Sequence, residues 1–287
     1  MKDTFILVEY NNVQYPEEYT AEIKEVAGHF DKDSISINFP YSLHTEYSYG
    51  KRKFDSNIIS KYFELRTSEK NGIPQLWKSD IWAREFADFI IELTNNSEYL
   101  RNIEIHPPFN DYCSLEEFAG RYTIFEKKIH EKYPDVSIVI ENREGSMYRG
   151  GKFLFRNSKE LISLFELIQK RNLKLGVVLD FPQLLTSEKI NTLEFDLVKY
   201  TDIINQISAY KHLIKGIHIW GKKKSVNNRW IAHVGTLDTY FGNNMHNKNE
   251  FIKGIYKICD DNIRRFLVPE VNSGREDLVK VLNDILK

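Results

Sequence analysis

Short apolar segments recur along the second half of the chain, and four of them end on a side chain that commonly binds metal ions. The residues at these ends are Glu141, Asp180, His218 and Glu270. A short apolar run between turn-forming residues is typical of a strand that is buried on both faces. The pattern therefore predicts buried parallel strands with polar groups at their carboxyl ends.

Helical patterns alternate with these strands from about residue 100, where a further strand over 103–106 begins the series. We expect helices over residues 114–132, 158–171, 193–213 and 248–260, and a closing helix after a Ser-x-x-Glu capping box at 273–276. Strand–helix–strand crossovers form parallel sheets. The 287 residues are close to the roughly 250 typical of a (β/α)₈ barrel. The sequence predicts an α/β fold, a (β/α)₈ TIM barrel that forms a single domain over residues 1–287.

The first quarter of the chain is less regular. Strands are expected over 5–9 and 35–39 with a helix over 16–29 between them, and a helix over 79–93 is capped by Ser79. A polar, tyrosine-rich stretch over 41–75 is a candidate lid or insertion, because long loops usually have a function of their own. Residues 62–66 within it could be the strand that brings the count to eight.

Composition and charge narrow the class of protein. The formal net charge of −1 gives no global attraction to nucleic acid, although local basic patches remain. The two cysteines, Cys113 and Cys259, have no CxxC spacing and indicate a reducing compartment. The first apolar stretch is too short for a signal peptide, and no apolar run approaches the roughly 20 residues that span a bilayer. We expect a soluble cytoplasmic protein with no membrane partner.

A shared divalent-metal site explains the four strand ends best. A single Glu or Asp at such a position is typically a helix cap or a solvated charge. Burying several carboxylates together, however, is costly unless a cation neutralises them. His106, at the end of its own strand, either joins this set or is a histidine hydrogen-bonded beneath the loops.

The order of these motifs resembles the xylose-isomerase-like TIM-barrel superfamily over roughly residues 100–275. The motifs that carry the resemblance are His106-Pro107, Glu141-Asn142-Arg143-Glu144-Gly145, Asp180, His218, His233-Val234-Gly235 and Pro269-Glu270. That superfamily includes sugar isomerases and epimerases and the endonuclease IV type of apurinic-site endonuclease. The resemblance implies a cation held by Glu141, Asp180, His218 and Glu270, and mixed carboxylate and imidazole ligands suit Mn²⁺, Mg²⁺, Co²⁺ or Zn²⁺.

The sequence departs from the endonuclease branch, whose trinuclear cluster needs more ligands. The histidine expected three residues after the aspartate is Gln183, and the expected Asp-x-His motif is replaced by Asn-Asn-Arg-Trp at 227–230. The nearest candidate for an early-strand histidine is His44, which lies past the expected strand end at residue 39, and a solvated loop histidine is the simpler interpretation. The cluster is therefore incomplete, and one metal fits better, or two if His106 helps to bind a second ion with Glu141.

Three functions remain open. The leading one is a metal-dependent sugar or polyol isomerase or epimerase, in which the resemblance implies that Glu141 and Glu270 are both ligands and acid/base groups, while Asp180 and His218 are ligands only. The alternative is a metal-dependent phosphodiesterase of the apurinic-site or UV-damage endonuclease type. The third is a non-catalytic barrel that binds a ligand or partner.

Four further residues are candidates for substrate binding. Arg143 could grip a carboxylate or phosphate, Gln183 could bond a substrate hydroxyl, and His233 could line the barrel mouth. Lys222 belongs to a lysine-rich loop, 221–224, which is either a phosphate-binding patch or solvated charge. The expected partner is a small sugar or sugar phosphate, with nucleic acid as the alternative; residues 41–75 could also form an oligomer contact.

Overall fold

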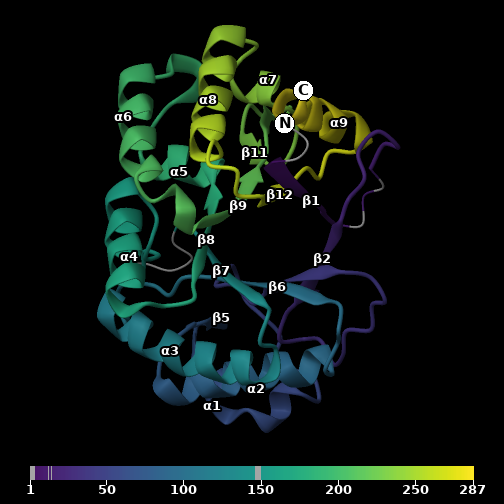
Figure 1. The fold of residues 1–287 in the computed structure, drawn as a ribbon, viewed down its shortest axis with the longest axis vertical. Helices are drawn as coiled ribbons and strands as arrows, with labels where there is room; N and C mark the ends of the chain where they lie inside the picture. Colours follow the sequence, from purple (N-terminus) through teal and green to yellow (C-terminus); the bar gives the residue numbers. More distant parts are fainter. Residues whose placement is uncertain (1–3, 12, 14, 146–149) are drawn as a thin grey trace. The chain divides into compact units, whose positions relative to one another are not determined.

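The strands close into one barrel. The computed structural model describes residues 4–11, 13, 15–145 and 150–287. Eight parallel strands are hydrogen-bonded in the order β1-β12-β9-β8-β7-β6-β3-β2. Their bounds are Phe5–Glu9 (β1), Ile23–Gly28 (β2), Tyr41–Thr45 (β3), Leu100–Ile105 (β6), Ser137–Glu141 (β7), Gly176–Asp180 (β8), Ile214–Ile219 (β9) and Arg265–Pro269 (β12). The predicted α/β fold, a (β/α)₈ TIM barrel, is confirmed (Figure 1).

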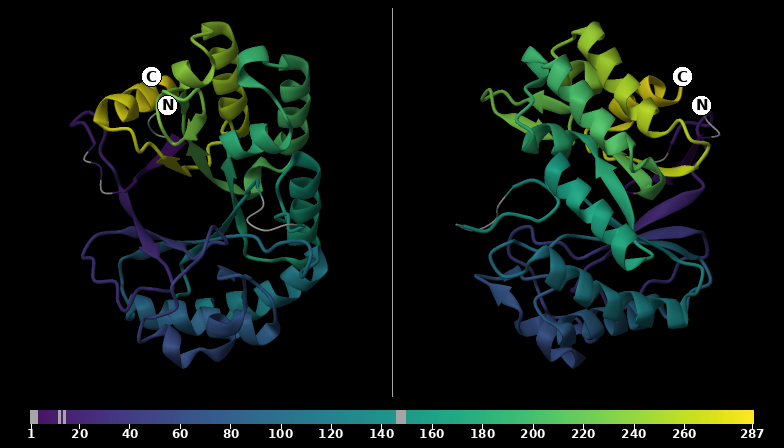
Figure 2. Two further views of the ribbon diagram at one scale, coloured as in Figure 1. Left: turned by 180° about the vertical axis from the view of Figure 1, so that it is seen from behind. Right: turned by 60° about the vertical axis from the view of Figure 1, so that its left-hand side comes forward.

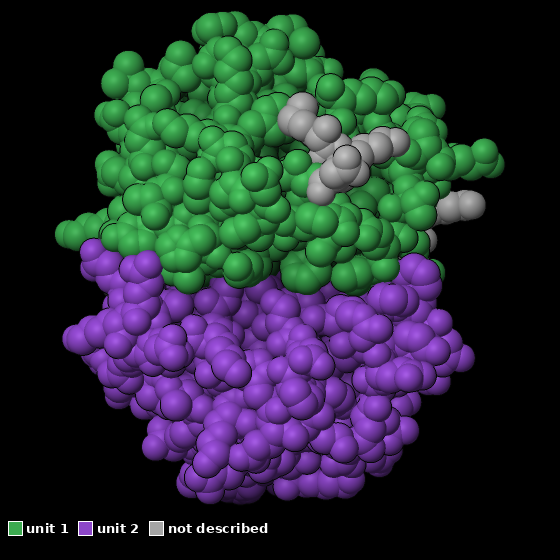
Figure 3. All heavy atoms as spheres, viewed as in Figure 1, with its two compact units in different colours: residues 1–25, 157–162, 177–287 green, residues 26–156, 163–176 purple. Residues whose placement is uncertain are grey.

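Two compact units divide the chain (Figure 3). Unit 1 comprises residues 1–25, 157–162 and 177–287, and unit 2 comprises residues 26–156 and 163–176. The assignment of residues 1–287 to a single domain stays a prediction. Each unit contains part of the predicted chemistry.

Unit 1 contains β1, β8, β9 and β12, and their register brings two of the predicted residues side by side. Asp180 pairs with His218 across β8 and β9, and Val268 pairs with His218 across β9 and β12. The side chain of Arg265 is completely buried, and its Nε donates to the carbonyl oxygen of Ile214 at 3.0 Å, which ties the start of β12 to β9. The strand ends that carry Asp180, His218 and Glu270 therefore lie in a fixed register.

Helices follow the strands of unit 1. They are α5 (Phe181–Ser187), α6 (Leu197–Ser208), α7 (Leu237–Tyr240), α8 (Met245–Ile258) and α9 (Arg275–Leu286), with 3-10 turns η3 (Thr192–Glu194) and η4 (Lys211–Leu213). Helices α6 and α8 lie side by side in both figures (Figures 1 and 2). The Tyr200 hydroxyl of α6 donates to the carbonyl oxygen of Phe251 in α8 at 2.7 Å.

Unit 2 contains β3, β6 and β7 beside a layer of helices. Its helices are α1 (Phe63–Thr67), α2 (Asp80–Thr94) and α3 (Leu115–Lys132), with a small hairpin of β4 (Glu69–Lys70) and β5 (Ile73–Pro74); α4 (Ser158–Arg171) contributes residues to both units. Helices α2 and α3 pack against each other through an aromatic cluster. The Trp77 ring lies 5.3 Å from those of Phe118 and Phe125, and Trp82 lies 4.6 Å from Phe86. Such clusters supply much of the apolar burial that stabilises a domain.

The predicted helix starts are largely confirmed. Ser79 caps α2 by accepting a hydrogen bond from the backbone N–H of Trp82, and Ser114 forms a reciprocal capping box with Glu117 at the start of α3. The box expected at 273–276 is wrong. Ser273 Oγ instead accepts from the N–H of Gly235 at 2.8 Å and donates to Asp277. The N-cap residue of α9 is therefore Gly274, which supplies no side-chain cap.

Three expectations for the first hundred residues are wrong. The expected helix over 16–29 contains β2, because pairing of Ile23 with Val8 of β1 overrides the helix-favouring glutamates before it. Residues 35–39 form no strand, and β3 follows instead, paired with β6. Residues 62–66 lie mostly in α1, where the Glu85 carboxylate accepts from the N–H groups of Glu64 and Leu65 and so stabilises the helix start.

The lysine-rich segment expected to be a loop over 221–224 includes a strand instead. β10 (Lys222–Lys224) and β11 (Trp230–Ala232) form an antiparallel hairpin, in which Lys224 pairs with Trp230. Residues 227–230, where the Asp-x-His motif is missing, lie at the turn and the start of β11. At the start of the 41–75 stretch, β3 is a barrel strand; a lid role for the remainder stays a prediction.

Across the described residues, no helix combines the length and the apolar character needed to cross a membrane.

Candidate functional site

Asp180 ends β8 and begins α5 with no loop between them. Its Oδ1 accepts a hydrogen bond from the backbone N–H of Gln183 at 2.8 Å, so Asp180 is also the N-cap of the helix. Its Oδ2 accepts from the indole Nε1 of Trp220 at 2.9 Å, and the side chain is fully buried. Two neutral N–H donors thus hold a buried carboxylate in one orientation.

His218 and Glu270 meet at the ends of β9 and β12. His218 Nδ1 lies 3.3 Å from Glu270 Oε1, and His233 Nδ1 lies 3.3 Å from Glu270 Oε2. The indole of Trp220 stacks on the His233 ring with 4.3 Å between ring centres. The predicted residue His233 therefore contacts Glu270, and Trp220 contacts both Asp180 and His233.

Asp180, His218 and Glu270 form a group that could hold a divalent ion. One ligand atom from each lies within 4.8 Å of the other two, and all three side chains are buried. The donor set of two carboxylates and one imidazole suits Mn²⁺, Mg²⁺, Co²⁺ or Zn²⁺. The cost of burying two carboxylates together is relieved by a bound cation, so the residues fit such an ion.

Tyr10 was missed by the sequence reasoning, although it directly follows β1. Its pKa is raised above the ordinary value, first by burial and then by the negative charge of Glu270. The phenol therefore keeps its proton at neutral pH. The strand-end rule applied to β1 would have selected Glu9, the last residue of the strand, so the pattern gave no signal for Tyr10.

In unit 2, His106 and Glu141 are in direct contact. His106 Nε2 lies 3.2 Å from Glu141 Oε2, and Arg143 Nη1 lies 3.2 Å from the same oxygen. His106 and Glu141 are buried, and burial lowers the pKa of His106 to about 4, against the opposing effect of Glu141. A neutral imidazole is the form that binds metal ions. Arg143, predicted to grip a substrate anion, contacts Glu141.

His44 lies on β3, so its interpretation as a solvated loop histidine is wrong. Its ring centre is 4.6 Å from that of His106, and its Nδ1 is 3.8 Å from Glu104 Oε1. His44, Glu104 and His106 offer one ligand atom each within 4.8 Å of one another. Glu104 was missed, although a charge between Ile103 and Ile105 in an otherwise apolar strand is a recognisable signal.

Another buried glutamate, Glu46, adjoins this cluster, because its backbone carbonyl oxygen lies 3.3 Å from His106 Nδ1. Its carboxylate accepts from Arg52 Nε at 2.8 Å and from the N–H groups of Phe30 and Tyr47. Burial raises the pKa of Glu46, and Arg52 opposes that shift. The guanidinium groups of Arg52 and Arg143 lie 4.4 and 4.8 Å from the centre of the Tyr47 ring. Tyr47 therefore packs against two arginines, each of which holds a buried glutamate.

The remaining residues predicted to bind substrate, Gln183 and Lys222, make different contacts. Gln183 contacts Asp180 through its backbone N–H. Lys222 lies partly buried on β10, where Nζ donates to Thr186 Oγ1 at 3.3 Å. Lys223 and Lys224 of the same lysine-rich segment are exposed.

Comparison with known proteins identifies relatives in fold only. No family model and no curated protein sequence match the chain. The crystal structure of AsfvAP:AG has a TM-score of 0.58 at 10% identity, covering 99% of this chain and 100% of its own. A probable 3-DHS dehydratase, AsbF, from Bacillus anthracis (0.43, 11%, covering 86% and 76%) and SMc04130 from Sinorhizobium meliloti 1021 (0.44, 10%, covering 86% and 77%) are less similar. The first likeness agrees with the barrel that the resemblance predicts, and it carries no information on activity.

Proposed function

We propose that the protein is a divalent-metal-dependent isomerase or epimerase acting on a sugar or polyol. The observation that carries the proposal is the buried group of Asp180, His218 and Glu270, whose ligand atoms lie within 4.8 Å of one another. Its carboxylate and imidazole donors suit small divalent ions. When bound, such an ion supplies Lewis acidity to adjacent oxygens of a hydroxy-ketone and so acidifies the proton on the neighbouring carbon.

Glu270 is proposed as one of the two proton-transfer groups. Its oxygens contact His218 and His233 at 3.3 Å each, so two imidazoles orient the carboxylate. A positioned carboxylate can remove or return a carbon-bound proton as a general base or acid. Asp180 and His218 are proposed as ligands only, and Gln183 and His233 as groups near the substrate.

Glu141 is proposed as the second acid/base group and as a metal ligand, on the basis of the family resemblance and its strand-end position. His106 Nε2 and Arg143 Nη1 both lie 3.2 Å from its Oε2. A cationic guanidinium stabilises the ionised form of a neighbouring carboxylate. Arg143 therefore favours a Glu141 that is ready to accept a proton, and His106 is proposed as an additional ligand.

A phosphodiesterase of the apurinic-site type is the second candidate, and one observation favours it. His44 lies beside His106, with 4.6 Å between ring centres, so an early-strand histidine is available for a second ion. Against it, Gln183 and residues 227–230 still lack the side chains that a trinuclear cluster requires.

Metal content and two activity assays test the proposal. Protein purified without chelators is analysed for bound metal and then assayed on a ketose panel and on a duplex with one abasic site. Turnover of a ketose with about one divalent ion per chain is the expected result. Cleavage of the duplex with about three zinc ions per chain would overturn the isomerase in favour of the nuclease, and protein that binds no metal would overturn both.

The variant Glu141→Gln tests the role of this glutamate, whether the protein is an isomerase or a phosphodiesterase. The amide cannot accept a proton and is a poorer ligand, so activity should be abolished and metal binding weakened. Full turnover by this variant would refute the role proposed for Glu141.

A further inference from the structure

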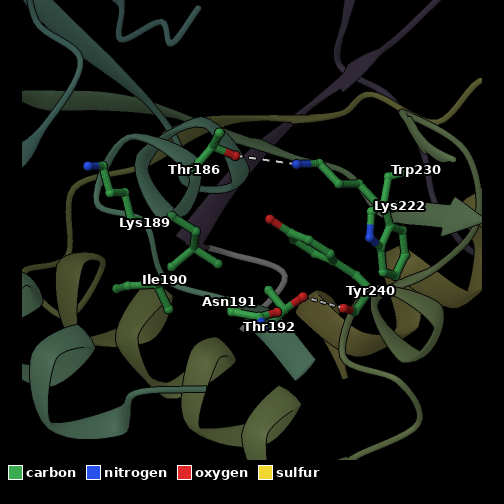
Figure 4. Close-up of a pocket in the computed structure, with 9 residues that line it drawn as sticks. Thr186, Lys189, Ile190, Asn191, Thr192, Lys222, Trp230 and Tyr240 are labelled. Atoms are coloured by element: carbon green, nitrogen blue, oxygen red, sulfur yellow. Dashed lines mark hydrogen bonds between the residues drawn. The ribbon is translucent and has the colours of Figure 1, made fainter. Parts of the chain in front are cut away.

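A pocket in unit 1 opens beside the β10–β11 hairpin and has no role in the chemistry described so far (Figure 4). Its volume is about 330 Å³, and its lining includes Thr186, Lys189, Thr192, Lys222, Trp230 and Tyr240. Ligand pockets in proteins span roughly 300–1,000 Å³, so this one is of a size for a single small molecule. A nucleic-acid strand would need a longer groove.

Two lysines line this pocket, the exposed Lys189 and the partly buried Lys222, and the ammonium group of Lys222 is the more desolvated of the two. Of its three N–H donors, one reaches Thr186 Oγ1 at 3.3 Å, and Nζ lies 5.2 Å from the Trp220 ring centre and 5.5 Å from that of Tyr240. Within the described ranges, no carboxylate lies within ion-pair distance of this group. Burial lowers the pKa of Lys222, against the opposing charge of Asp180. A partly desolvated cation with two N–H donors left over calls for an anionic ligand.

The other walls suit a polyhydroxylated carbon chain. Trp230 lies at the rim with 43% of its surface exposed, and the buried Tyr240 points its hydroxyl into the pocket (Figure 4). Burial raises the pKa of Tyr240, so the phenol remains a hydrogen-bond donor. Aromatic faces pack against apolar C–H surfaces, and the Tyr240 hydroxyl can bond a ligand hydroxyl. The Thr186 hydroxyl already donates to the carbonyl oxygen of Pro182 at 2.8 Å and accepts from Lys222, so its part is to hold the ammonium group in place.

One side chain connects the pocket to the candidate metal site of the same unit. Trp220 donates to Asp180 at 2.9 Å, and its other contacts include the Tyr240 ring, stacked at 6.4 Å between centres, and the Lys222 ammonium. Trp220 thus contacts Asp180 on one side and two pocket-lining side chains, Tyr240 and Lys222, on the other.

We propose that this pocket binds the phosphate group of a phosphorylated sugar, with Lys222 pairing with the phosphate and the Tyr240 and Trp230 rings contacting the carbon chain. The inference rests on the proposed isomerase or epimerase function and deepens it, because it names the substrate as a sugar phosphate. Lysine binds phosphate as a point charge, whereas the planar fork of arginine is the better match for a carboxylate.

Binding to metal-free protein tests the assignment. Calorimetric titration in EDTA compares a ketopentose 5-phosphate, the same ketopentose without phosphate, the corresponding sugar acid and inorganic phosphate. The phosphorylated sugar should bind about tenfold or more tightly than the free sugar, as expected for one charge-assisted contact. Equal affinity for both sugars would overturn the proposal, and tighter binding of the sugar acid would overturn the phosphate assignment.

Three variants locate the effect. Lys222→Met should lose the preference for the phosphorylated sugar, Lys222→Arg should retain most of it, and Lys223→Met, which alters the exposed neighbour on the same strand, should leave it unchanged. The pocket assignment would be contradicted if Lys222→Met kept the preference for the phosphorylated sugar, or if Lys223→Met lost as much of that preference as Lys222→Met. Melting temperatures close to that of the unaltered protein show that each variant is folded.

Failure of the inference is distinguishable from failure of the proposed function. A Lys222-dependent phosphate preference without any isomerisation by the metal-loaded protein would refute the isomerase and leave a sugar-phosphate pocket. Turnover of an unphosphorylated ketose, with no preference for its phosphate in binding, would refute the pocket assignment and leave the isomerase.

Discussion

The two units hold their buried acids by different means. In unit 1, Asp180 accepts from an indole and a backbone N–H, and Glu270 contacts two imidazoles. In unit 2, Glu46 and Glu141 each contact an arginine, whereas a further buried glutamate, Glu104, contacts the imidazole of His44. A carboxylate that already has a cationic partner gains less from a metal ion than one held by neutral groups. We infer that the unit 1 cluster depends more on a bound ion, and that the unit 2 cluster contributes more to stability without one.

The largest expected effect is on catalysis, from Glu270→Gln in unit 1. Loss of a ligand and proton-transfer group should lower kcat by about 10³-fold or more, together with a fall in bound metal. Steady-state kinetics on the ketose found by the panel and metal analysis measure both. Glu276→Gln, on the exposed first turn of α9, is the matched control and should behave like the unaltered protein.

Next in size is a loss of stability from Arg52→Met in unit 2. Removing Arg52 leaves the carboxylate of Glu46, only 1% exposed, without its cationic partner, and we expect the free energy of unfolding to fall by about 3 kcal/mol. Urea unfolding measures this.

Two companion variants show whether the charge is responsible. Arg66→Met, at an exposed position of α1, should cost little, and the double change Glu46→Gln with Arg52→Met should recover part of the loss. A single Arg52→Met that unfolds like the unaltered protein would mean that unit 2 is not stabilised by this pair.

A smaller effect is expected from Trp220→Phe. The change keeps an aromatic ring against His233 but removes the N–H that binds Asp180 Oδ2. Groups that orient a metal ligand typically contribute 10- to 100-fold in affinity, so Mn²⁺ should bind about tenfold or more weakly. An unchanged Mn²⁺ dissociation constant would show that the indole has no part in holding the ion.

The most gradual effect is a pH dependence of stability in unit 2. Burial lowers the pKa of His29 to about 3, from its ordinary value near 6.5, with the charge of His44 as the next cause. The His29 imidazole is therefore protonated below about pH 6.5 in the unfolded chain but only below about pH 3 in the folded protein. Stability is complete above pH 6.5 and falls towards pH 3 by up to about 1.4 kcal/mol per pH unit.

Urea unfolding between pH 7.5 and 4.5 measures that slope, and His29→Gln should make it shallower. His246→Gln, at an exposed position of α8, should leave the slope as it is. Equal slopes for His29→Gln and the unaltered protein would show that His29 does not resist protonation.

The stretch from residue 100 to residue 287 was the more predictable region, for a physical reason. Its strands are short apolar runs buried on both faces, and such runs have a clear beginning and end, so the positions of Asp180, His218 and Glu270 follow from the pattern alone. Residues 1–75 carry weaker local signals that tertiary contacts override, as when Glu85 caps α1 or β1 pairs with Ile23. As a result, a strand was expected over 35–39 and His44 was expected in the loop after it, whereas His44 lies on β3.

Contacts between distant residues could not be predicted in the same way. The packing of Tyr47 against Arg52 and Arg143, and the bond from Trp220 to Asp180, join residues that are 5 to 96 positions apart and follow no periodicity. The pocket likewise depends on the hairpin of β10 and β11, because Lys222 and Trp230 reach one cavity only when the chain turns back on itself. Sequence patterns locate the ligand-type residues, and three-dimensional packing decides what holds them.

Each oxygen of Asp180 already accepts one N–H bond. The carboxylate therefore cannot readily rotate into the orientation in which both of its oxygens bind the same ion. Calcium takes roughly six to eight oxygen ligands and often both oxygens of one carboxylate, whereas smaller ions accept fewer and more rigidly placed donors. The fixed carboxylate at the junction of β8 and α5 would therefore favour small divalent ions over calcium, whether or not a substrate is bound.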